Sequence, residues 1–284
     1  MEKQIVITNK STFGGEINKI STNGADKFHV LADFDRTLTK NTAPDGTKIS
    51  SLISILRDEN YLTPDYPEKA KSLAKYYISI EKNPKISLDE RIKAMHEWWT
   101  KHFDLLIKSK LNKKDIEKAV LSHRLQLRQG VEEFLKFLKG KNIPLVILSS
   151  NGLGDESISI YLKNKNLLFD NIYIISNKYE WDKNGFAVGI KKPIIHTLNK
   201  DETILKNFPF YKKIADRKNI FLLGDSPSDV DMITGFDYDN LFKIGFWNEP
   251  TPENQSVYEK NYDMLIKNDG SFEQINEILK QMFD

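Results

Sequence analysis

Two aspartates in the stretch FHVLADFDRTLT, Asp33 and Asp35, have the type and spacing for chemistry. They follow a short, largely apolar run that ends in turn-forming residues, and such a run is typical of a buried parallel strand. The active sites of open α/β sheets lie at the carboxyl ends of these strands. Residues two apart on an extended backbone point to the same side, so the two carboxylates would be neighbours. One could attack an electrophile while the other transfers protons; the plainer alternative is a strand that ends in an acidic turn.

Two later apolar runs, IPLVIL and NIFLL, also end in polar residues. The first leads into Ser149 and Ser150, and the second leads through a glycine into Asp225, with Asp229 a short turn later. Carboxylates that converge at strand ends form a hard oxygen site, of the kind that Mg²⁺ uses together with a phosphate. Histidine and cysteine are missing from these positions, which argues against zinc. We therefore expect a magnesium site.

Transfer of a phosphoryl group needs an in-line nucleophile, a cation on the non-bridging oxygens and hydrogen-bond donors around the rest. Asp33 could attack phosphorus to form an aspartyl-phosphate, while Asp35 protonates the leaving alkoxide and later deprotonates water. Lys200 could neutralise remaining charge, and the hydroxyl of Ser149 or Ser150 could hold an oxygen. Lys200 alone is a weak signal, because most lysines are solvated. The joint occurrence of these groups, in this order, is the stronger indication.

The elements that must position these residues alternate between strand and helix after residue 127, which predicts an α/β fold with a doubly wound parallel sheet. Residues 1–40 and 128–284 would form this Rossmann-like core. Glycine is absent from residue 51 to 127, and helical spacing dominates there. We therefore expect residues 41–127 to form a helical cap domain inserted into the core.

Short-range signals predict where several elements begin or turn. Ser87 followed by Glu90 is the signature of a capping box at a helix start, and Ser271 with Gln274 repeats it near the end of the chain. Residues 1–27 would decorate the edge of the core with a short strand, IVIT. The expected turns are at Gly14-Gly15, Asn23-Gly24 and Asn184-Gly185, the last of them in a β-hairpin.

The composition, with 39% hydrophobic and 29% charged residues among 284, indicates a globular chain of one large or two modest domains. A net charge of +2 gives no electrostatic reason to expect nucleic acid or an anionic membrane as a partner. Cysteine is absent, which excludes disulfides and thiolate chemistry and agrees with a reducing compartment. The sequence shows no signal peptide and no apolar segment long enough to span a membrane. We expect a cytoplasmic protein that is a monomer or weak dimer.

The motifs DFDRT and GDSPSD, with a strand-end serine and a lysine between them, resemble the four motifs of the haloacid dehalogenase superfamily of phosphohydrolases. More closely, the chain resembles the eukaryotic-type cytosolic pyrimidine 5′-nucleotidases over roughly residues 27 to 284. The segments KYYISIEKNP, HEWWTKHFDLLI, LRQGVEEFL, GFAVGIKKPIIHTLNK and LFKIGFWNE carry this closer resemblance. It implies a haloacid dehalogenase core with a helical cap, and magnesium-dependent hydrolysis of nucleoside monophosphates.

The resemblance also assigns roles to residues of the core. Asp33 corresponds to the nucleophile and Asp35 to the general acid and base. The magnesium ligands would be Asp33, the backbone carbonyl of Asp35, and Asp225. Asp229 corresponds to a carboxylate in or just behind the metal shell.

The substrate contacts that the resemblance implies are Lys200 for the phosphate and Glu81, in the cap, for the nucleobase. A carboxylate at position 81 can accept from an exocyclic amine such as that of cytosine. Tyr76, Tyr77 and Glu81 would share one helical stretch, with Glu81 on the face of Tyr77. One alternative is a phosphatase of another small metabolite such as phosphoserine, although Glu81 has no convincing arginine partner in the sequence. A non-catalytic regulator is the other, although it would have lost the aspartates.

Three positions depart from the family pattern. Where relatives have one serine, this chain has two, and Ser149 is favoured over Ser150 because strand lengths tolerate insertions less well than loops. His102 replaces a cap serine, which leaves base preference open, and Arg36 replaces an apolar residue. The adjacent tryptophans at 98 and 99 fit packing of the cap, with base stacking as the alternative.

Overall fold

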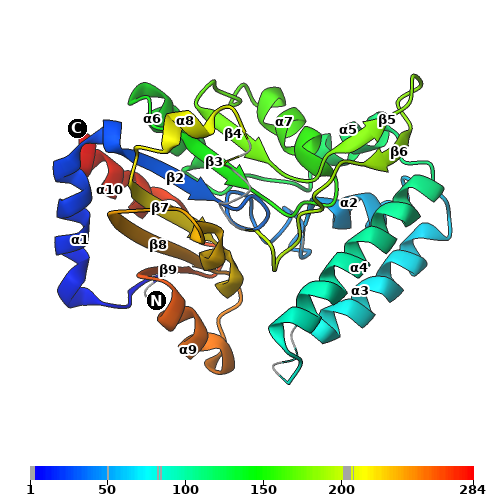
Figure 1. The fold of residues 1–284 in the computed structure, drawn as a ribbon, viewed down its shortest axis with the longest axis horizontal. Coiled ribbons are helices and arrows are strands. Elements are labelled where there is room, and N and C mark those ends of the chain that lie inside the picture. The colour runs from blue at the N-terminus through cyan, green and yellow to red at the C-terminus, as the bar shows by residue number, and fades with distance from the viewer. Residues whose placement is uncertain (1–3, 50, 82, 84, 201–205, 207) are drawn as a thin grey trace.

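The computed structural model describes residues 4–49, 51–81, 83, 85–200, 206 and 208–284 of the chain (Figure 1). Within this part, seven strands form one sheet in which the outermost strand, β1, is antiparallel to β9 and all other neighbours are parallel. The order across the sheet is β1 (Ile5–Ile7), β9 (Met264–Lys267), β8 (Asn240–Trp247), β7 (Asn219–Gly224), β2 (Phe28–Ala32), β3 (Leu145–Leu148) and β4 (Ile172–Ile175).

Helices cover both faces of this sheet, and side chains alternate between the two cores along each strand. In β2, Val30 and Ala32 are buried in one core and Leu31 in the other. The first face is covered by α1 (Lys10–Asn23), α6 (Val131–Gly140), α7 (Gly154–Asn164) and α10 (Glu273–Phe283). The second is covered by α8 (Tyr211–Ile214), the 3₁₀-helix η3 (Pro227–Ile233) and α9 (Pro252–Asn261). This architecture confirms the predicted α/β fold with a doubly wound, mostly parallel sheet.

Helices also fill the segment between β2 and α6. They are α2 (Leu52–Asp58), α3 (Tyr66–Glu81), α4 (Leu88–Lys108) and α5 (Lys113–Leu121). Figure 1 shows α3 and α4 side by side to the right of the sheet. The capping box at the start of α4 is confirmed, because Ser87 and Glu90 each accept from the backbone N–H of the other.

A hairpin outside the sheet joins this helical segment. It consists of β5 (Tyr179–Trp181) and β6 (Ala187–Ile190), and its turn contains Gly185 at φ +80°, which confirms the predicted hairpin. Ala187 N–H donates to the carbonyl of Leu111 (2.9 Å), and Lys113 N–H donates to that of Gly185 (3.0 Å). The hairpin, which lies in sequence within the expected core, is thus hydrogen-bonded to the inserted helices.

The predicted turn at Gly14-Gly15 is wrong, because both glycines lie inside α1. Burial of Ile20 and packing of Ile17 against the sheet stabilise the helix there, and outweigh a cost of about 1 kcal/mol per glycine. The turn at Gly24 is present, with φ +78°, and a short 3₁₀-helix, η1 (Ala25–Lys27), follows it.

The predicted capping box of Ser271 and Gln274 is also wrong. Helix α10 begins at Glu273 and its N-cap is Phe272, so Ser271 lies one residue too early for the box, and its Oγ accepts from the N–H of Glu273 (3.4 Å) instead. The ring of Phe272 is fully buried against Phe134 and Phe246, and its N–H donates to the carbonyl of Gln129 at 2.8 Å. Tertiary packing of an aromatic residue therefore decides where this helix starts.

No helix in the described part of the chain is long and apolar enough to cross a membrane.

Candidate active site

Three neighbouring strands end at the same edge of the sheet. β2 lies between β3 and β7, and Ala32 is in register with Ile147 of β3 and Leu223 of β7. The residues that follow these strands are therefore brought together at one edge, as the sequence predicts. They line a cavity of about 330 Å³ that also receives side chains from α2, α3 and α4. The polar residues of its floor are Asp33, Asp35, Arg36, Ser149, Ser150, Lys200, Asp225, Ser226 and Asp229.

Lys200 forms a bridge between two carboxylates in this floor. Its Nζ lies 2.7 Å from Asp33 Oδ1 and 2.9 Å from Asp229 Oδ1, and all three side chains are less than 10% exposed. A buried lysine with two buried counter-charges is fixed in place, because withdrawing either partner would leave an unpaired charge out of water. The structure therefore places Lys200 next to Asp33, where the sequence predicted a group that neutralises phosphate charge.

Asp229 is held from its other oxygen by the backbone. Its Oδ2 accepts from the N–H groups of Asp225 (3.0 Å) and Ser226 (2.9 Å). This approach requires Gly224, because a Cβ there would come within 2.4 Å of Asp229 Cβ. Oxygens of Asp33, Asp225 and Asp229 lie within 4.8 Å of one another.

These three carboxylates fit a magnesium ion, since the set offers hard oxygen donors and no nitrogen or sulfur. The side chain of Asp35 lies outside the set. Its Oδ1 accepts from the N–H of Leu52 (3.0 Å), the first residue of α2, so the predicted acid is tied to the inserted helices. The backbone carbonyl of Asp35, which the resemblance implies as a metal ligand, stays a prediction.

Burial raises the pKa of three carboxyl groups in the cavity floor, those of Asp35, Asp225 and Asp33. The pKa of Asp35 is raised to about 8 by burial and then by the charge of Asp33. That of Asp225 is raised to about 7 by burial, against the lowering effect of Arg36. That of Asp33 is raised to about 6 by burial, against the lowering effect of Lys200. For Lys200, burial alone would lower the pKa, but Asp229 and Asp33 raise it above its ordinary value.

Arg128 organises the turn after Asp35, and sequence reasoning gave it no role. Its buried guanidinium donates to the carbonyls of Arg36 (2.5 Å), Thr37 (2.8 Å) and Gly270 (3.0 Å). It also donates to Asn248 Oδ1 (2.5 Å). No local pattern could have revealed this role, because the partners lie more than 90 residues away in sequence.

The two candidate serines both line the cavity; Ser149 is buried and Ser150 is half-buried. Both tryptophans also line it, with ring centroids 5.8 Å apart. Trp99 packs closely over Gly152, where a Cβ would meet its ring at 3.0 Å. The tryptophans therefore contribute both to packing and to the cavity wall, which keeps both sequence interpretations open.

His102 of α4 and Glu81 of α3 also line the cavity. His102 is buried, its Nε2 lies 3.2 Å from Tyr66 Oη, and burial lowers its pKa to about 4, so its ring is neutral. Glu81 is half-buried, and its Oε1 accepts from the hydroxyl of Thr197 at 2.5 Å. Sequence reasoning missed Thr197, which lies in the same segment as Lys200.

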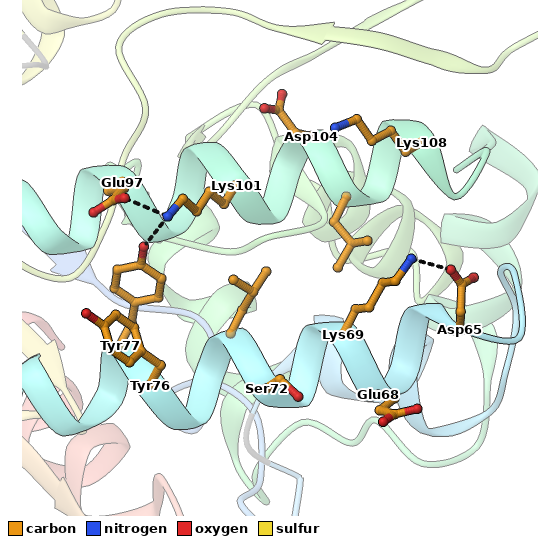
Figure 2. Close-up of a pocket in the computed structure, with 12 residues that line it drawn as sticks. Asp65, Glu68, Lys69, Ser72, Tyr76, Tyr77, Glu97, Lys101, Asp104 and Lys108 are labelled. Carbon is orange, nitrogen blue, oxygen red and sulfur yellow. Dashed lines mark hydrogen bonds and ion pairs between the residues drawn. The ribbon is translucent and has the colours of Figure 1, made fainter.

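A larger cavity, of about 880 Å³, lies between α3 and α4 and none of the strand-end carboxylates lines it (Figure 2). Two of its lysines pair with acidic residues that also line it: Lys101 lies 2.6 Å from Glu97 and donates to Tyr77 Oη, and Lys69 pairs with Asp65. Tyr77 lines this cavity and Glu81 the other, so the face that the sequence assigned to both is divided between two cavities. We therefore place the candidate site at the strand ends.

This chain is similar to known proteins over most of its length. The family model described as Pyrimidine 5′-nucleotidase (UMPH-1) matches residues 36–283. The chain belongs to this family. It is 32% identical over 267 residues to the 7-methylguanosine phosphate-specific 5′-nucleotidase of Gallus gallus, covering 94% of this chain and 91% of the relative. The protein of the same name from Homo sapiens is 31% identical, with 94% and 88% covered.

Solved structures share the fold of this pyrimidine 5′-nucleotidase family member. Cytosolic 5′-nucleotidase IIIB bound to cytidine superposes with a TM-score of 0.88 at 26% identity, covering 99% of this chain and 94% of that one. A phosphoserine phosphatase shares the fold, with a TM-score of 0.54 at 19% identity and coverage of 90% and 98%. The chain is thus a hydrolase of the nucleotidase type, the predicted pyrimidine 5′-nucleotidase family is confirmed, and the fold is one that a phosphoserine phosphatase shares.

Proposed function

We propose that this protein is a magnesium-dependent 5′-nucleotidase that hydrolyses pyrimidine nucleoside monophosphates through an aspartyl-phosphate. The observation that carries the proposal is the buried bridge of Lys200 between Asp33 and Asp229, beside Asp225 and across one cavity from Glu81. A phosphate would meet the carboxylates and the lysine, and the base would meet the cap. Residues 1–40 and 128–284 are proposed as the core and 41–127 as the cap.

The first half of the reaction uses both aspartates of the motif. An oxygen of Asp33 attacks phosphorus, the bond from phosphorus to the 5′ oxygen breaks, and the leaving oxygen takes a proton from Asp35. A raised pKa suits this role, because it keeps the proton on Asp35 near neutral pH. In the second half, Asp35 takes a proton from water, whose oxygen attacks phosphorus and releases Asp33 and inorganic phosphate.

The remaining residues of the floor hold the phosphate. Lys200 balances negative charge on its oxygens, and the hydroxyl of Ser149 or Ser150 donates to one of them. A magnesium ion would reduce the repulsion between the Asp33 carboxylate and the phosphate. Its ligands would be Asp33, Asp225 and the backbone carbonyl of Asp35, with Asp229 either a further ligand or a carboxylate just behind them.

The side chain of Glu81 in the cap suits a pyrimidine base that carries one amine donor. Glu81 already accepts from Thr197 with Oε1, which leaves Oε2 for a donor such as the amine of cytosine. A second candidate is 7-methylguanosine monophosphate, which the names of the relatives suggest. The stacked tryptophans at 98 and 99 favour it, because a cationic purine binds well over indole rings.

A substrate screen tests the proposal. Release of phosphate would be measured for CMP, UMP, 7-methyl-GMP, GMP, AMP, phosphoserine and an aryl phosphate, with and without Mg²⁺. We expect the highest kcat/KM for a pyrimidine nucleotide. Preference for 7-methyl-GMP would select the second candidate, and preference for phosphoserine, with Arg57 of the cavity wall as the carboxylate partner, would reject both.

Glu81→Gln tests the base contact in the same assay. The variant should lower kcat/KM for CMP by a factor that corresponds to about 1–3 kcal/mol of lost transition-state binding, the cost of a disrupted buried polar contact. The same loss on an aryl phosphate, which has no base, would show that Glu81 supports the fold instead.

The proposed setting is the cytoplasm, in agreement with the name of the cytosolic structural relative. Oligomeric state is proposed as a monomer or weak dimer.

A further inference from the structure

One short segment, residues 194–200, contacts both ends of the cavity. At its end, Lys200 bridges the buried carboxylates of the floor. Three residues earlier, the hydroxyl of Thr197 donates to Oε1 of Glu81, the last residue of α3, at 2.5 Å. The ring of His196 also lies against that of His96 in α4, with centroids 6.3 Å apart. The segment that presents the lysine is therefore seated against two helices of the cap.

This segment is held firmly by two asparagines. Asn177, which follows β4, accepts from the N–H of Ile195 and donates to its carbonyl, both at 2.9 Å. Asn199 accepts from the N–H of His196 (2.6 Å) and donates to the carbonyl of Ile194 (2.8 Å). Such paired side-chain to backbone bonds replace the ladder that the segment lacks, so its shape is fixed relative to the sheet.

The bond from Thr197 has a chemical consequence for Glu81. A carboxylate offers two acceptor oxygens and can rotate about its last torsion, so an unconstrained glutamate could present either or both. Here Oε1 is engaged, and none of the described residues donates to Oε2. One oxygen therefore remains for a ligand, and its direction is set by the core through Thr197.

We propose that Thr197 is a positioning residue for base recognition, which orients Glu81 and fixes its offset from Lys200 so that the cavity selects a nucleotide with a single amine donor at the base. The inference rests on the proposed function, in which Glu81 contacts the base and Lys200 the phosphate. It adds that the base is recognised by the pair of Glu81 in the cap and Thr197 in the core, so that a side chain outside the cap helices affects base preference.

The alternative is that the hydrogen bond from Thr197 to Glu81 only holds the cap against the core, and it predicts a different result. If Thr197 only stabilised closure, its loss would slow every phosphate ester alike. If Thr197 orients Glu81, its loss lowers kcat/KM only for substrates that have a base. The change should be in KM, because the base contact is the same in the ground and transition states.

The test compares Thr197→Val with Thr197→Ser on CMP and on an aryl phosphate. Valine keeps the shape and removes the hydroxyl, whereas serine keeps the hydroxyl. We expect Thr197→Val to lower the ratio of kcat/KM for CMP to kcat/KM for the aryl phosphate about tenfold, mainly through KM for CMP. Thr197→Ser should keep the ratio within about twofold. Thr22→Val is a matched control, because the hydroxyl of Thr22 donates to the carbonyl of Asn18 on the exposed side of α1, far from the cavity in the fold (Figure 1).

A double variant links the effect to Glu81. In a Glu81→Ala background, Thr197→Val should change the ratio less than about twofold, since nothing is left to orient. The inference is overturned by an unchanged ratio in Thr197→Val, by failure of serine to restore it, or by an undiminished effect without Glu81. Wild-type enzyme is measured first: if it does not prefer nucleotides to the aryl phosphate, the proposed function fails and takes this inference with it.

Discussion

Replacing Lys200 by methionine tests the charge balance of the site. The substitution keeps most of the side-chain volume but leaves Asp33 and Asp229, both less than 10% exposed, without the ammonium group that now lies 2.7 and 2.9 Å away. Removing one partner of a buried ion pair typically costs about 3–5 kcal/mol. We expect a loss of this size in the free energy of unfolding of the metal-free protein at pH 8.

The loss should shrink as the pH falls. The pKa of Asp33 is about 6 even while Lys200 lowers it, so it should rise further in the variant. A carboxyl group with a raised pKa binds more protons folded than unfolded, so its contribution to stability declines as pH rises through that window. At pH 5 the carboxyl can be neutral in the variant, and the cost of the missing lysine should be well below its value at pH 8.

Denaturation by urea, at pH 5 and pH 8, with and without Mg²⁺, measures these quantities. Mg²⁺ should recover part of the loss at pH 8, because a bound cation supplies the missing counter-charge and stabilises by linkage. Lys218→Met is the matched control, since Lys218 pairs at 2.6 Å with an Asp237 whose side chain is 85% exposed, and its loss should hardly matter. Equal losses in the two variants, or a loss independent of pH, would refute the charge balance described here.

Further outcomes are expected at the same site. EDTA should abolish turnover and added Mg²⁺ restore it, since the phosphate and Asp33 repel in a poorly screened cavity; full turnover by metal-free enzyme would reject the magnesium site. Asp33→Asn should lower kcat by several orders of magnitude, as loss of a nucleophile does, and a rate within about tenfold of wild type would mean that another group attacks. Asp35→Asn should abolish hydrolysis yet stabilise the metal-free fold at pH 8, because the pKa of about 8 shows that the ionised carboxyl is disfavoured there; a denaturation midpoint below that of wild type would contradict this.

The sequence predicts the floor of the site well, for a physical reason. Parallel strands that are buried on both faces can be recognised in the sequence as apolar runs. Their carboxyl ends lie at the same edge of the sheet, which brings Asp33, Ser149 and Asp225 together. It does not decide between the two serines. Successive residues of a strand point to opposite faces, so an offset of one residue at the end of β3 exchanges their directions.

The contacts that the sequence does not reveal are those between distant residues. Glu81 and Thr197 are separated by 116 positions, and Arg128 reaches partners 91 to 142 positions away. Periodicity and capping signals describe neighbours within a turn or a strand, so they carry no information on such pairs. The same limit explains the wrong start of α10, where burial of Phe272 overrides a local capping signal.

Arg36 shows how these distant contacts shape the chemistry. Its φ of +62° is unfavourable for a residue with a Cβ, at a cost on the order of 1 kcal/mol. The turn nevertheless persists, because the carbonyl of Arg36 accepts from Arg128 (2.5 Å) and from Asn248 (3.0 Å). In this conformation Arg36 Nε lies 3.4 Å from Asp225 Oδ2 and lowers the pKa that burial would otherwise raise further. Arg36 is thus a second cation of the site, and a metal bound by Asp225 would share that carboxylate with it.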